Sequence, residues 1–461
     1  MSWGTADQIH RTAKILIDAG KASSPEEARR FLETLVLQVA VGPEIEHDPA
    51  AQAALATIVN AGRRAFLGGV RVHLDTNPPM TTGWAAGLTA AEAVAEYGGQ
   101  VVKRLTTARP TLVVGRPAEP PGSPLLYLTW RGWSGGVVQS ERSCLDGDGS
   151  VLAGVAAAGL GLSEIFQRQL GAVLPGRRDV GVSLWRPDLD WRLPDAAGPA
   201  VRYLPARLWL LGLGHLGQAY AWTLGMLPYA QPAEAELGLV DFDRIVEGND
   251  ATQLLARPRD AGQRKARVVA AALERRGFAT RIVERAYDEH FHPVAHASPA
   301  RNEPAIALAG FDDVAPRRLL GESGFTHVTD AGLGSGPVEY LDMVLHSFPA
   351  AEDPGTAFAG QDASARPLVR AYEQEITRRA EAGDDETAAR CGMLDIAGVT
   401  VGAAFVGTFA STLVVADVLR LLHGGKDYSV ISVDLRSPSG IQAVPNSAPG
   451  EYPAPAYTLA G

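Results

Sequence analysis

The feature that most constrains this chain is a glycine-rich turn between an apolar strand and a helix. The strand is predicted over Leu208–Gly212, the turn reads Gly212-Leu213-Gly214-His215-Leu216-Gly217, and the helix covers Leu216–Leu227. The strand Glu236–Asp241 follows, which makes a βαβ unit. Glycines let the backbone approach a phosphate, and the helix N-terminus offers free N–H groups. A parallel sheet with a nucleotide site is expected, although the turn alone also fits NAD, FAD and purely structural turns.

Polar residues follow the turn at spacings that suit a nucleotide. In chain order they are Asp241, Asp243, Asn249, Gln253 and Lys265. An acid at the end of the second strand is placed for ribose hydroxyls, and a lysine on the next helix can reach triphosphate oxygens. Asp312 follows a later strand, where a carboxylate beside a phosphate is a natural Mg²⁺ ligand. The set favours triphosphate chemistry over hydride transfer.

In this order the motifs resemble the ThiF/MoeB/HesA superfamily, which includes the ubiquitin-activating enzymes. The family has an acid-x-acid strand end, then Asn-Leu-x-Arg-Gln, a helix lysine and a late aspartate, and the resemblance covers roughly Leu208 to Tyr428. It implies that Asp312 holds Mg²⁺ and that Lys265 and Asp312 stabilise departing pyrophosphate. It also implies that ATP is bound by Gly212, Gly214, Gly217, Asp241, Asp243, Asn249, Gln253 and Lys265.

Two residues depart from the family's Asn-Leu-x-Arg-Gln pattern. Its leucine is Asp250 here and its arginine is Thr252, whereas Arg317 fits an arginine that follows the late aspartate. The missing arginine normally helps to neutralise phosphate charge, so another cation is expected to replace it. The candidates left open are Arg29, Arg30, Arg244 and Arg257.

Cys391 lies ahead of the closing helix, after a polar stretch from Ala350 to Ala389 that is expected to be a mobile crossover loop. The superfamily places its acyl- or persulfide-forming cysteine near this point, which implies that Cys391 is a catalytic nucleophile. Arg390 and a helix N-terminus would lower the pKa of its thiol. The alternative is a buried, inert cysteine. Cys144 is expected to be structural.

The two halves of the chain end alike, which predicts a duplicated domain. Each closes with a helix rich in small residues, Val151–Leu170 and Val399–Leu422, and each helix leads to a short strand, Val180–Leu184 and Val430–Leu435. The alternative is that any α/β domain can end in this way. Since the first half has no glycine-rich strand–helix turn, its copy is expected to have lost nucleotide binding.

The expected fold is α/β, with two ThiF-type Rossmann-like domains, mostly parallel doubly wound sheets and an N-terminal helical segment. The helices expected at the N-terminus are Ala6–Ala19, Pro25–Val41 and Pro49–Ala61. The expected parts are the helical segment at residues 1–60, an inactive domain at 61–190, a linker at 191–205, and an active domain at 206–461 whose crossover loop spans 350–391.

Composition excludes several classes of protein. A net charge of -10 gives non-specific nucleic-acid binding no electrostatic support. Two cysteines rule out a cysteine-rich zinc site or disulfide scaffold and fit a reducing cytoplasm. No membrane span is expected, because no run of about 18 uninterrupted apolar residues occurs. No signal peptide is expected, because the N-terminus has no basic region followed by an apolar run.

The leading hypothesis is ATP-dependent adenylation of the C-terminal glycine carboxylate of a ubiquitin-like protein. Cys391 would take the acyl group as a thioester and pass it to a conjugating enzyme. The arrangement resembles the activating enzyme of a bacterial ubiquitin-like conjugation operon, a type associated with antiviral defence; homodimer formation is left open. The alternatives are a sulfur-carrier adenylyltransferase, against which the lack of paired Cys-x-x-Cys motifs counts, an NAD(P)-dependent oxidoreductase, and a non-catalytic scaffold.

Overall fold

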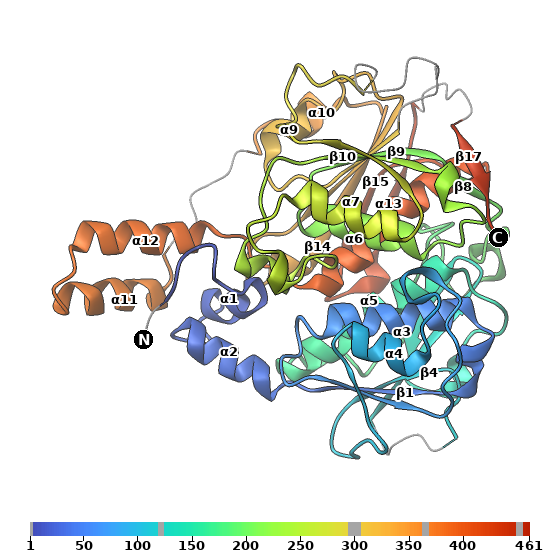
Figure 1. The fold of residues 1–461 in the computed structure, drawn as a ribbon, viewed down its shortest axis with the longest axis horizontal. Coiled ribbons are helices and arrows are strands. Elements are labelled where there is room, and N and C mark those ends of the chain that lie inside the picture. Colours follow the sequence, from blue (N-terminus) through green and yellow to red (C-terminus); the bar gives the residue numbers. More distant parts are fainter. Residues whose placement is uncertain (1–2, 119–123, 294–305, 362–367, 449–454) are drawn as a thin grey trace.

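Two α/β units lie against each other in the computed structural model, which describes residues 3–118, 124–293, 306–361, 368–448 and 455–461 (Figure 1). The first unit has a seven-stranded sheet in the order β3-β2-β1-β4-β5-β6-β7. Its strands are β1 (Leu37–Val41), β2 (Val70–Leu74), β3 (Gln100–Val101), β4 (Thr111–Val114), β5 (Leu125–Arg131), β6 (Ser134–Val138) and β7 (Val180–Ser183). Its helices are α3 (Pro49–Gly62), α4 (Ala90–Glu96) and α5 (Val151–Gln169).

The second unit has an eight-stranded sheet in the order β11-β10-β9-β12-β13-β14-β15-β16. Its strands are β9 (Arg207–Leu211), β10 (Glu236–Val240), β11 (Ala279–Val283), β12 (Ile306–Ala309), β13 (His327–Leu333), β14 (Asp342–Phe348), β15 (Tyr428–Asp434) and β16 (Gln442–Pro445). Its helices are α6 (His215–Met226), α7 (Lys265–Arg275), α9 (Val314–Arg318), α10 (Pro354–Ala357), α11 (Arg370–Glu381), α12 (Glu386–Gly398) and α13 (Ala404–Leu422).

The two sheets share one topology, which confirms the duplicated α/β architecture. In the first unit β3, β2, β1, β4 and β5 are parallel, and β6 and β7 are antiparallel additions. In the second, β11, β10, β9, β12 and β13 are parallel, and β14, β15 and β16 are antiparallel. β1 therefore corresponds to β9 and β4 to β12, while α3 and α6 follow the equivalent first strands.

Equivalent helices of the two units pack on each other. A Cβ at Gly159 on α5 would lie 3.0 Å from the side chain of Phe409 on α13, so the small residue lets the helices approach closely. The rings of Phe166 and Phe405 lie 5.3 Å apart across the same interface. Within the described residues α13 is the one helix long and apolar enough to cross a membrane, but 89% of its apolar window is buried. The closing helix predicted there is therefore a buried core helix.

Reciprocal hydrogen bonds join the ends of α5 and α13 to the opposite unit. Gln167 Nε2 on α5 donates to the Leu435 carbonyl at 3.0 Å, and Arg420 on α13 donates to the Leu184 carbonyl at 2.7 Å. Each donor lies three residues beyond a buried acid, Glu164 in α5 or Asp417 in α13. Glu164 and Asp417 occupy the same place in the internal repeat. The duplication is therefore visible in single side chains of the closing helices as well as in the sheets.

The predicted N-terminal boundary is wrong. The helix expected over Pro25–Val41 ends at Thr34 as α2 (Pro25–Thr34), and residues 37–41 form β1, a central strand buried at every position. A short apolar run cannot be assigned to helix or strand by periodicity alone, and burial inside a parallel sheet decided this one. The first α/β unit therefore begins near residue 36, and only α1 (Arg11–Asp18) and α2 precede it.

Two other expected segments differ from the structure. The linker expected over residues 191–205 ends in β8 (Tyr203–Pro205), which pairs with β17 (Tyr457–Leu459) in a two-stranded sheet. The crossover expected as a loop contains α10, α11 and the first part of α12, although residues 362–367 lie outside the described ones. Figure 1 shows α11 and α12 as a pair at one end of the molecule, next to α1.

Candidate functional site

The glycine turn adopts the conformation that the sequence predicted. Gly212 has φ +78°, which disfavours residues with a side chain, and a Cβ at Gly217 would overlap the Gly212 carbonyl oxygen. Gly214 is the N-cap of α6, and nothing lies within 4 Å of the position its Cβ would take. Two glycines are thus required by the turn itself, and the third leaves open space at the start of the helix.

Asp241 ties this turn to the end of β10. Its Oδ2 accepts from the Leu213 N–H at 2.7 Å, and its Oδ1 accepts from the Asp243 N–H at 2.7 Å. Burial raises the pKa of the carboxyl, and the nearby Lys265 partly opposes that shift. Asp241 therefore fixes the backbone of the glycine turn at Leu213.

Lys265 begins α7 and lies beside the end of the same strand. Its Nζ forms an ion pair with Asp243 Oδ2 at 2.7 Å, with the lysine side chain 12% exposed and the aspartate 51% exposed. The Lys265 N–H donates to the Asp243 carbonyl at 3.0 Å. The structure thus brings Asp241, Asp243 and Lys265 together next to the glycine turn, at the carboxyl ends of β9 and β10.

Asn249 and Gln253 are buried and act on neighbouring backbone and side chains. Asn249 lies in the short helix η6 (Glu247–Ala251), and its Oδ1 accepts from the Val246 N–H at 3.0 Å. Gln253 Oε1 accepts from Gln218 Nε2 at 2.7 Å, and that nitrogen also donates to the Leu213 carbonyl at 3.2 Å. Gln218 therefore links the Gln253 segment to the glycine turn. Sequence reasoning missed it, although a polar residue on an apolar helix was a usable signal.

Asp250, which replaces a family leucine, is bound by two arginines of the first unit. Arg63 donates to its carboxylate at 2.9 Å and Arg64 at 2.8 Å, with the Arg64 side chain 1% exposed. Arg64 also donates to the carbonyls of Asp250, Leu254 and Ala256. Burial and the adjacent Arg63 lower the pKa of Arg64 to about 9. Burial raises the Asp250 pKa, but Arg64 and Arg63 outweigh it, and the net shift is downward.

Each arginine candidate named from the sequence has a hydrogen-bond or ion-pair partner within the chain. The exposed Arg29 and Arg30 contact Glu33 and Glu26 on their own helix, Arg257 contacts Glu96, and Arg244 donates to the Gly262 carbonyl. Thr252, which stands in place of the family arginine, is buried.

Arg11, at the start of α1, lies in the field of the late aspartate. Burial lowers its pKa, while the charges of Asp7 and Asp312 raise it. The chain before α1 is fixed over η6, because the Gly248 N–H donates to the Asp7 carbonyl at 2.7 Å. The charge of Arg11, in the N-terminal segment, therefore acts on Asp312, while its NH1 donates to the Ala6 carbonyl at 3.3 Å. No local motif marked Arg11 in the sequence.

Asp312 is exposed just beyond β12, on the far side of the glycine turn from Lys265. A Cβ at Gly212 would lie 3.1 Å from the Gly310 carbonyl oxygen, so this loop and the turn adjoin. The neighbouring Asp313 caps α9 by accepting from the Ala315 N–H at 3.2 Å. Within the described residues no group of three or more His, Cys, Asp or Glu side chains could hold a metal alone. Asp312 fits an Mg²⁺ ion whose other ligands are phosphate oxygens and water.

Arg317, which matched a family arginine, is part of a buried ion pair under this site. Its NH2 lies 2.5 Å from Asp330 Oδ2, and its guanidinium stacks 4.2 Å above the ring of Phe358. Asp330 lies on β13 directly beside the last residue of β12, Ala309. The pair fixes α9 against the sheet and so holds the loop that carries Asp312.

The first unit fills its own equivalent positions with carboxylates. Asp48 caps α3 by accepting from the N–H groups of Ala50 at 2.8 Å and Ala51 at 3.2 Å. Glu44 Oε2 accepts from the Arg116 N–H at 2.9 Å, beside the end of β4. A phosphate needs the helix N-terminal N–H groups that Asp48 occupies. The first copy therefore lacks the open turn found at Gly214.

Cys391 is exposed in the middle of α12, and not in a loop ahead of a helix as expected. The helix pair α11–α12 is docked on α1: Tyr372 Oη donates to Asp18 at 2.6 Å, and Lys14 Nζ donates to Asp18 at 2.6 Å and to the Ala397 carbonyl at 3.2 Å. Figure 1 shows α12 well apart from α6, so the structure does not place Cys391 next to the glycine turn.

Family models match both units of the chain. The BilD N-terminal domain matches residues 36–184, and the BilD C-terminal domain matches residues 204–425. The bacterial E1-like protein BilD of Collimonas sp. (strain OK412) is 38% identical over 437 residues, which are 92% of this chain and 90% of that protein. The chain belongs to the BilD family of bacterial E1-like proteins.

Solved structures with low sequence identity also align with part of this BilD-family chain. Escherichia coli MccB with MccA-N7isoASN is 15% identical, covers 54% of this chain and 65% of its own, and has a TM-score of 0.33. PaaA is 12% identical, covers 52% of this chain and 64% of its own, and has a TM-score of 0.32. The aligned part spans just under two thirds of each of those chains.

The family domain limits agree with the structural ones. The BilD N-terminal model begins one residue before β1, and the C-terminal model begins at the second residue of β8. Neither begins at residue 61, the predicted start of the first domain. The family match therefore supports moving residues 37–60 from the helical segment into the first α/β unit.

Proposed function

We propose that the second unit binds ATP over the glycine turn and adenylates the C-terminal carboxylate of a ubiquitin-like protein. The observation that carries the proposal is the convergence of the open turn at Gly214, the Lys265–Asp243 pair and Asp312 at the carboxyl ends of β9, β10 and β12. Membership of an E1-like family supports it. In the first unit Asp48 closes the equivalent turn, so one nucleotide site per chain is expected.

The chain's residues would act by position and charge. A carboxylate oxygen of the protein substrate forms a bond to the α-phosphorus of ATP, the bond from that phosphorus to the bridging oxygen breaks, and pyrophosphate leaves. N–H groups at the start of α6 would hold phosphate oxygens, and Asp241 would keep the turn in place. Lys265 and Arg11 would neutralise charge on the leaving group. Asp312 would hold Mg²⁺, which supplies further charge neutralisation when bound.

Cys391 is proposed to take the acyl group in a second step. Its thiolate would attack the acyl adenylate, a thioester would form, and AMP would leave with the electron pair of the broken bond. Exposure of the cysteine on a helix pair outside the sheets suits a group that must meet both the acyl adenylate and a conjugating enzyme. The proposed setting is the cytoplasm, in an antiviral conjugation pathway.

Membership of an E1-like family supports the alternative functions to different extents. An NAD(P)-dependent oxidoreductase has no support from membership of an E1-like family. A sulfur-carrier adenylyltransferase shares the first step and differs only in the fate of the acyl adenylate. A non-catalytic scaffold would keep the fold but not the exchange reaction, and homodimer formation stays a separate question.

The first step is tested by ATP–pyrophosphate exchange with radiolabelled pyrophosphate and purified ubiquitin-like proteins encoded near the gene. Exchange is expected for the native chain, and Asp312→Asn and Lys265→Ala should each lower it by about 100-fold or more. Absence of exchange with every carrier would contradict the adenylation proposal.

The second step is tested with cysteine variants of the same chain. Cys391→Ala should retain exchange and lose the adduct that thiols release, whereas Cys144→Ala should retain both. Burial raises the pKa of the half-buried Cys144 thiol, which makes it a suitable unreactive control. An adduct that persists in Cys391→Ala would remove Cys391 from the mechanism.

A further inference from the structure

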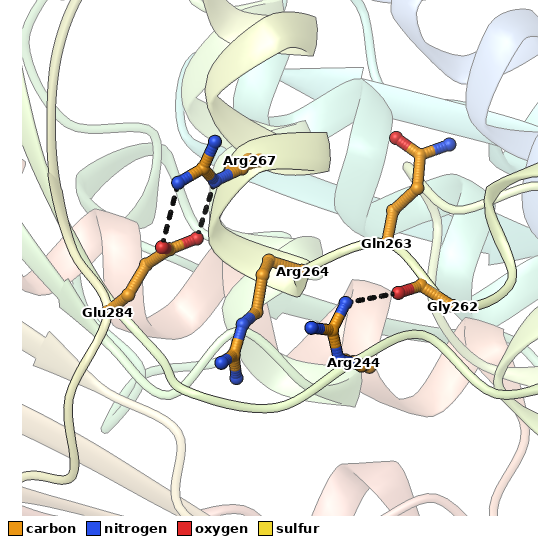
Figure 2. Close-up of a pocket in the computed structure, with 6 residues that line it drawn as sticks. All are labelled: Arg244, Gly262, Gln263, Arg264, Arg267 and Glu284. Atoms are coloured by element: carbon orange, nitrogen blue, oxygen red, sulfur yellow. Dashed lines mark hydrogen bonds and ion pairs between the residues drawn. The ribbon is translucent and has the colours of Figure 1, made fainter.

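A polar pocket opens beside the proposed nucleotide site. It has a volume of about 550 Å³ and lies between the start of α7 and the end of β11. Its lining residues are Arg244, Gly262, Gln263, Arg264, Arg267 and Glu284 (Figure 2). Four of the six lining residues carry a charge, so the pocket suits a charged ligand.

The pocket holds three guanidinium groups and one carboxylate. Arg267 forms a bidentate pair with Glu284, with Nε–Oε1 at 2.7 Å and NH2–Oε2 at 3.0 Å. The hydrogen bond from Arg267 lowers the Glu284 pKa, and the charges of Arg264 and Arg244 lower it further, so all three cations act on one acid. The lining therefore carries an excess of two positive charges in a chain whose net charge is -10.

Arg244 and Arg264 are held by carbonyl groups, which neutralise no charge. Arg244 NH1 donates to the Gly262 carbonyl at 2.7 Å, and Arg264 NH1 donates to the Phe242 carbonyl. Each guanidinium has other N–H donors that these bonds do not use. In Figure 2 the side chains of Arg264 and Arg244 lie side by side, while Gln263 turns away from them. Two neighbouring forks of this kind match the geometry of a phosphate group.

The position of these arginines points to a phosphate on a ribose. Arg244 directly follows Asp243, and Arg264 directly precedes Lys265, so the pocket adjoins the Lys265–Asp243 pair. In βαβ nucleotide folds the acid at the end of the second strand takes ribose hydroxyls, and an arginine beside it accommodates a phosphate carried there. The triphosphate itself is expected on the other side of the Lys265–Asp243 pair, at the start of α6 between Lys265 and Asp312.

We propose that this pocket binds a phosphate group on the 2′ or 3′ oxygen of an adenine nucleotide seated over the glycine turn. Such a nucleotide would compete with ATP and would hold the enzyme in an inhibited state. The inference rests on the proposed function only in placing an adenine nucleotide at that turn. A free phosphate ion has the same chemistry, and comparison with inorganic phosphate separates the two sources.

The test compares the binding of AMP, adenosine 2′,5′-bisphosphate, adenosine 3′,5′-bisphosphate and inorganic phosphate to the full chain by calorimetry. One of the bisphosphates should bind about 10- to 100-fold more tightly than AMP, because two charge-assisted hydrogen bonds are added. The double variant Arg244→Gln/Arg264→Gln should lose that preference and keep the affinity for AMP. The matched control Arg259→Gln, an exposed arginine outside the pocket, should keep the preference.

The outcomes separate this proposal from the proposed function. If AMP binds and neither bisphosphate binds more tightly, or if the preference survives in the double variant, the pocket proposal is wrong while adenylation stands. If inorganic phosphate binds as tightly as the bisphosphates, the ribose source is wrong. If no adenine nucleotide binds to any variant, both proposals fail. The same bisphosphate should inhibit pyrophosphate exchange in competition with ATP, and the double variant should resist that inhibition.

Discussion

At the residue scale, the structure explains a departure from the family motif, Asp250 in place of leucine. No role was predicted for Asp250 from the sequence. Its ion pairs to Arg63 and Arg64 bind η6 to the first unit. Arg64 is 186 residues from Asp250 in the chain, and no local pattern pairs them. Asp250 is thus a contact between the units, and through it the first unit holds a segment of the proposed nucleotide site in place.

Removal of Arg64 should therefore affect both stability and ATP binding. In Arg64→Met the partly buried Asp250 keeps only Arg63 of its two arginine partners. The free energy of unfolding should therefore fall by about 3 kcal/mol. Asp250→Leu, which restores the family residue, should cost a similar amount because Arg64 is left buried without a carboxylate. The double variant should recover most of the loss. Urea unfolding measures these values, and additive losses in the double variant would contradict a direct pair.

The Arg64 effect should also appear in enzyme kinetics. A displaced η6 moves Asn249 and Gln253, so Arg64→Met should raise the KM for ATP several-fold in the exchange reaction and change kcat less. Arg64→Lys, which keeps the charge, should recover part of the affinity. The more exposed Arg63 gives a matched control, since Arg63→Gln should have a smaller effect. Equal effects of the two single variants would argue against the special position of Arg64.

At the scale of elements, the sequence predicted the strand, turn and helix of β9 and α6. It did not predict the long-range contacts that hold them in place. The glycines, the apolar strand and Asp241 are local and were predicted in place. Gln218 and the packing of His215 against Gly407 depend on segments far away in the chain. Local spacing sets a turn, and tertiary contacts decide what fills the space around it.

Two glycines of this turn make a matched pair of variants. Gly217→Ala should destabilise the turn and abolish ATP binding, because its methyl group overlaps the Gly212 carbonyl oxygen. Gly214→Ala meets no atom of the chain, so thermal unfolding should be unchanged while ATP affinity falls, since the methyl group takes space that faces the phosphates. Calorimetric titration with ATP and thermal unfolding measure both effects. Full ATP affinity in Gly214→Ala would move the phosphates away from α6.

The start of α6 should also respond to acid. Burial lowers the pKa of His215 to about 4, so the folded state holds this group neutral while the unfolded chain binds a proton below about pH 6.5. The contribution of His215 to the free energy of unfolding is therefore present at neutral pH and declines as the pH falls from 6.5 to 4, by up to about 3 kcal/mol. Unfolding curves at pH 7 and pH 5 for the native chain and His215→Gln test this. An unchanged slope in the variant would contradict it.

At the scale of the whole molecule, α5 and α13 join the two units. Arg420 is buried, donates to Leu184 of the first unit and pairs with Asp417 at 2.6 Å. Asp417 also accepts from Thr329 and Ser347 and is hydrogen-bonded to His327. Burial raises the Asp417 pKa, but its hydrogen bond with His327 and the charge of Arg420 reverse the shift and hold that pKa well below its usual range.

Both units should unfold in one cooperative transition that depends on this interface. Arg420→Met leaves a buried carboxylate without its cation, so the free energy of unfolding should fall by about 3 to 5 kcal/mol. Gln167→Leu, at the equivalent place in α5, removes a neutral hydrogen bond and should cost about 1 kcal/mol. Urea unfolding followed by tryptophan fluorescence and by circular dichroism should give coincident curves. Two separate transitions would show that the units fold independently.

The sequence by itself determined the nucleotide core of the second unit and the duplication. Both are written in short-range spacing: glycines at a strand–helix turn, Asp241 to Lys265 on adjoining elements, and closing helices with the same pattern. Only the tertiary structure decided that β1 is a strand, that Arg11 and Arg64 reach the second unit, and that Cys391 lies on a helix away from the turn. The physical reason is that periodicity reports which face of a segment is apolar, whereas burial and long-range pairing depend on what the rest of the chain places against it.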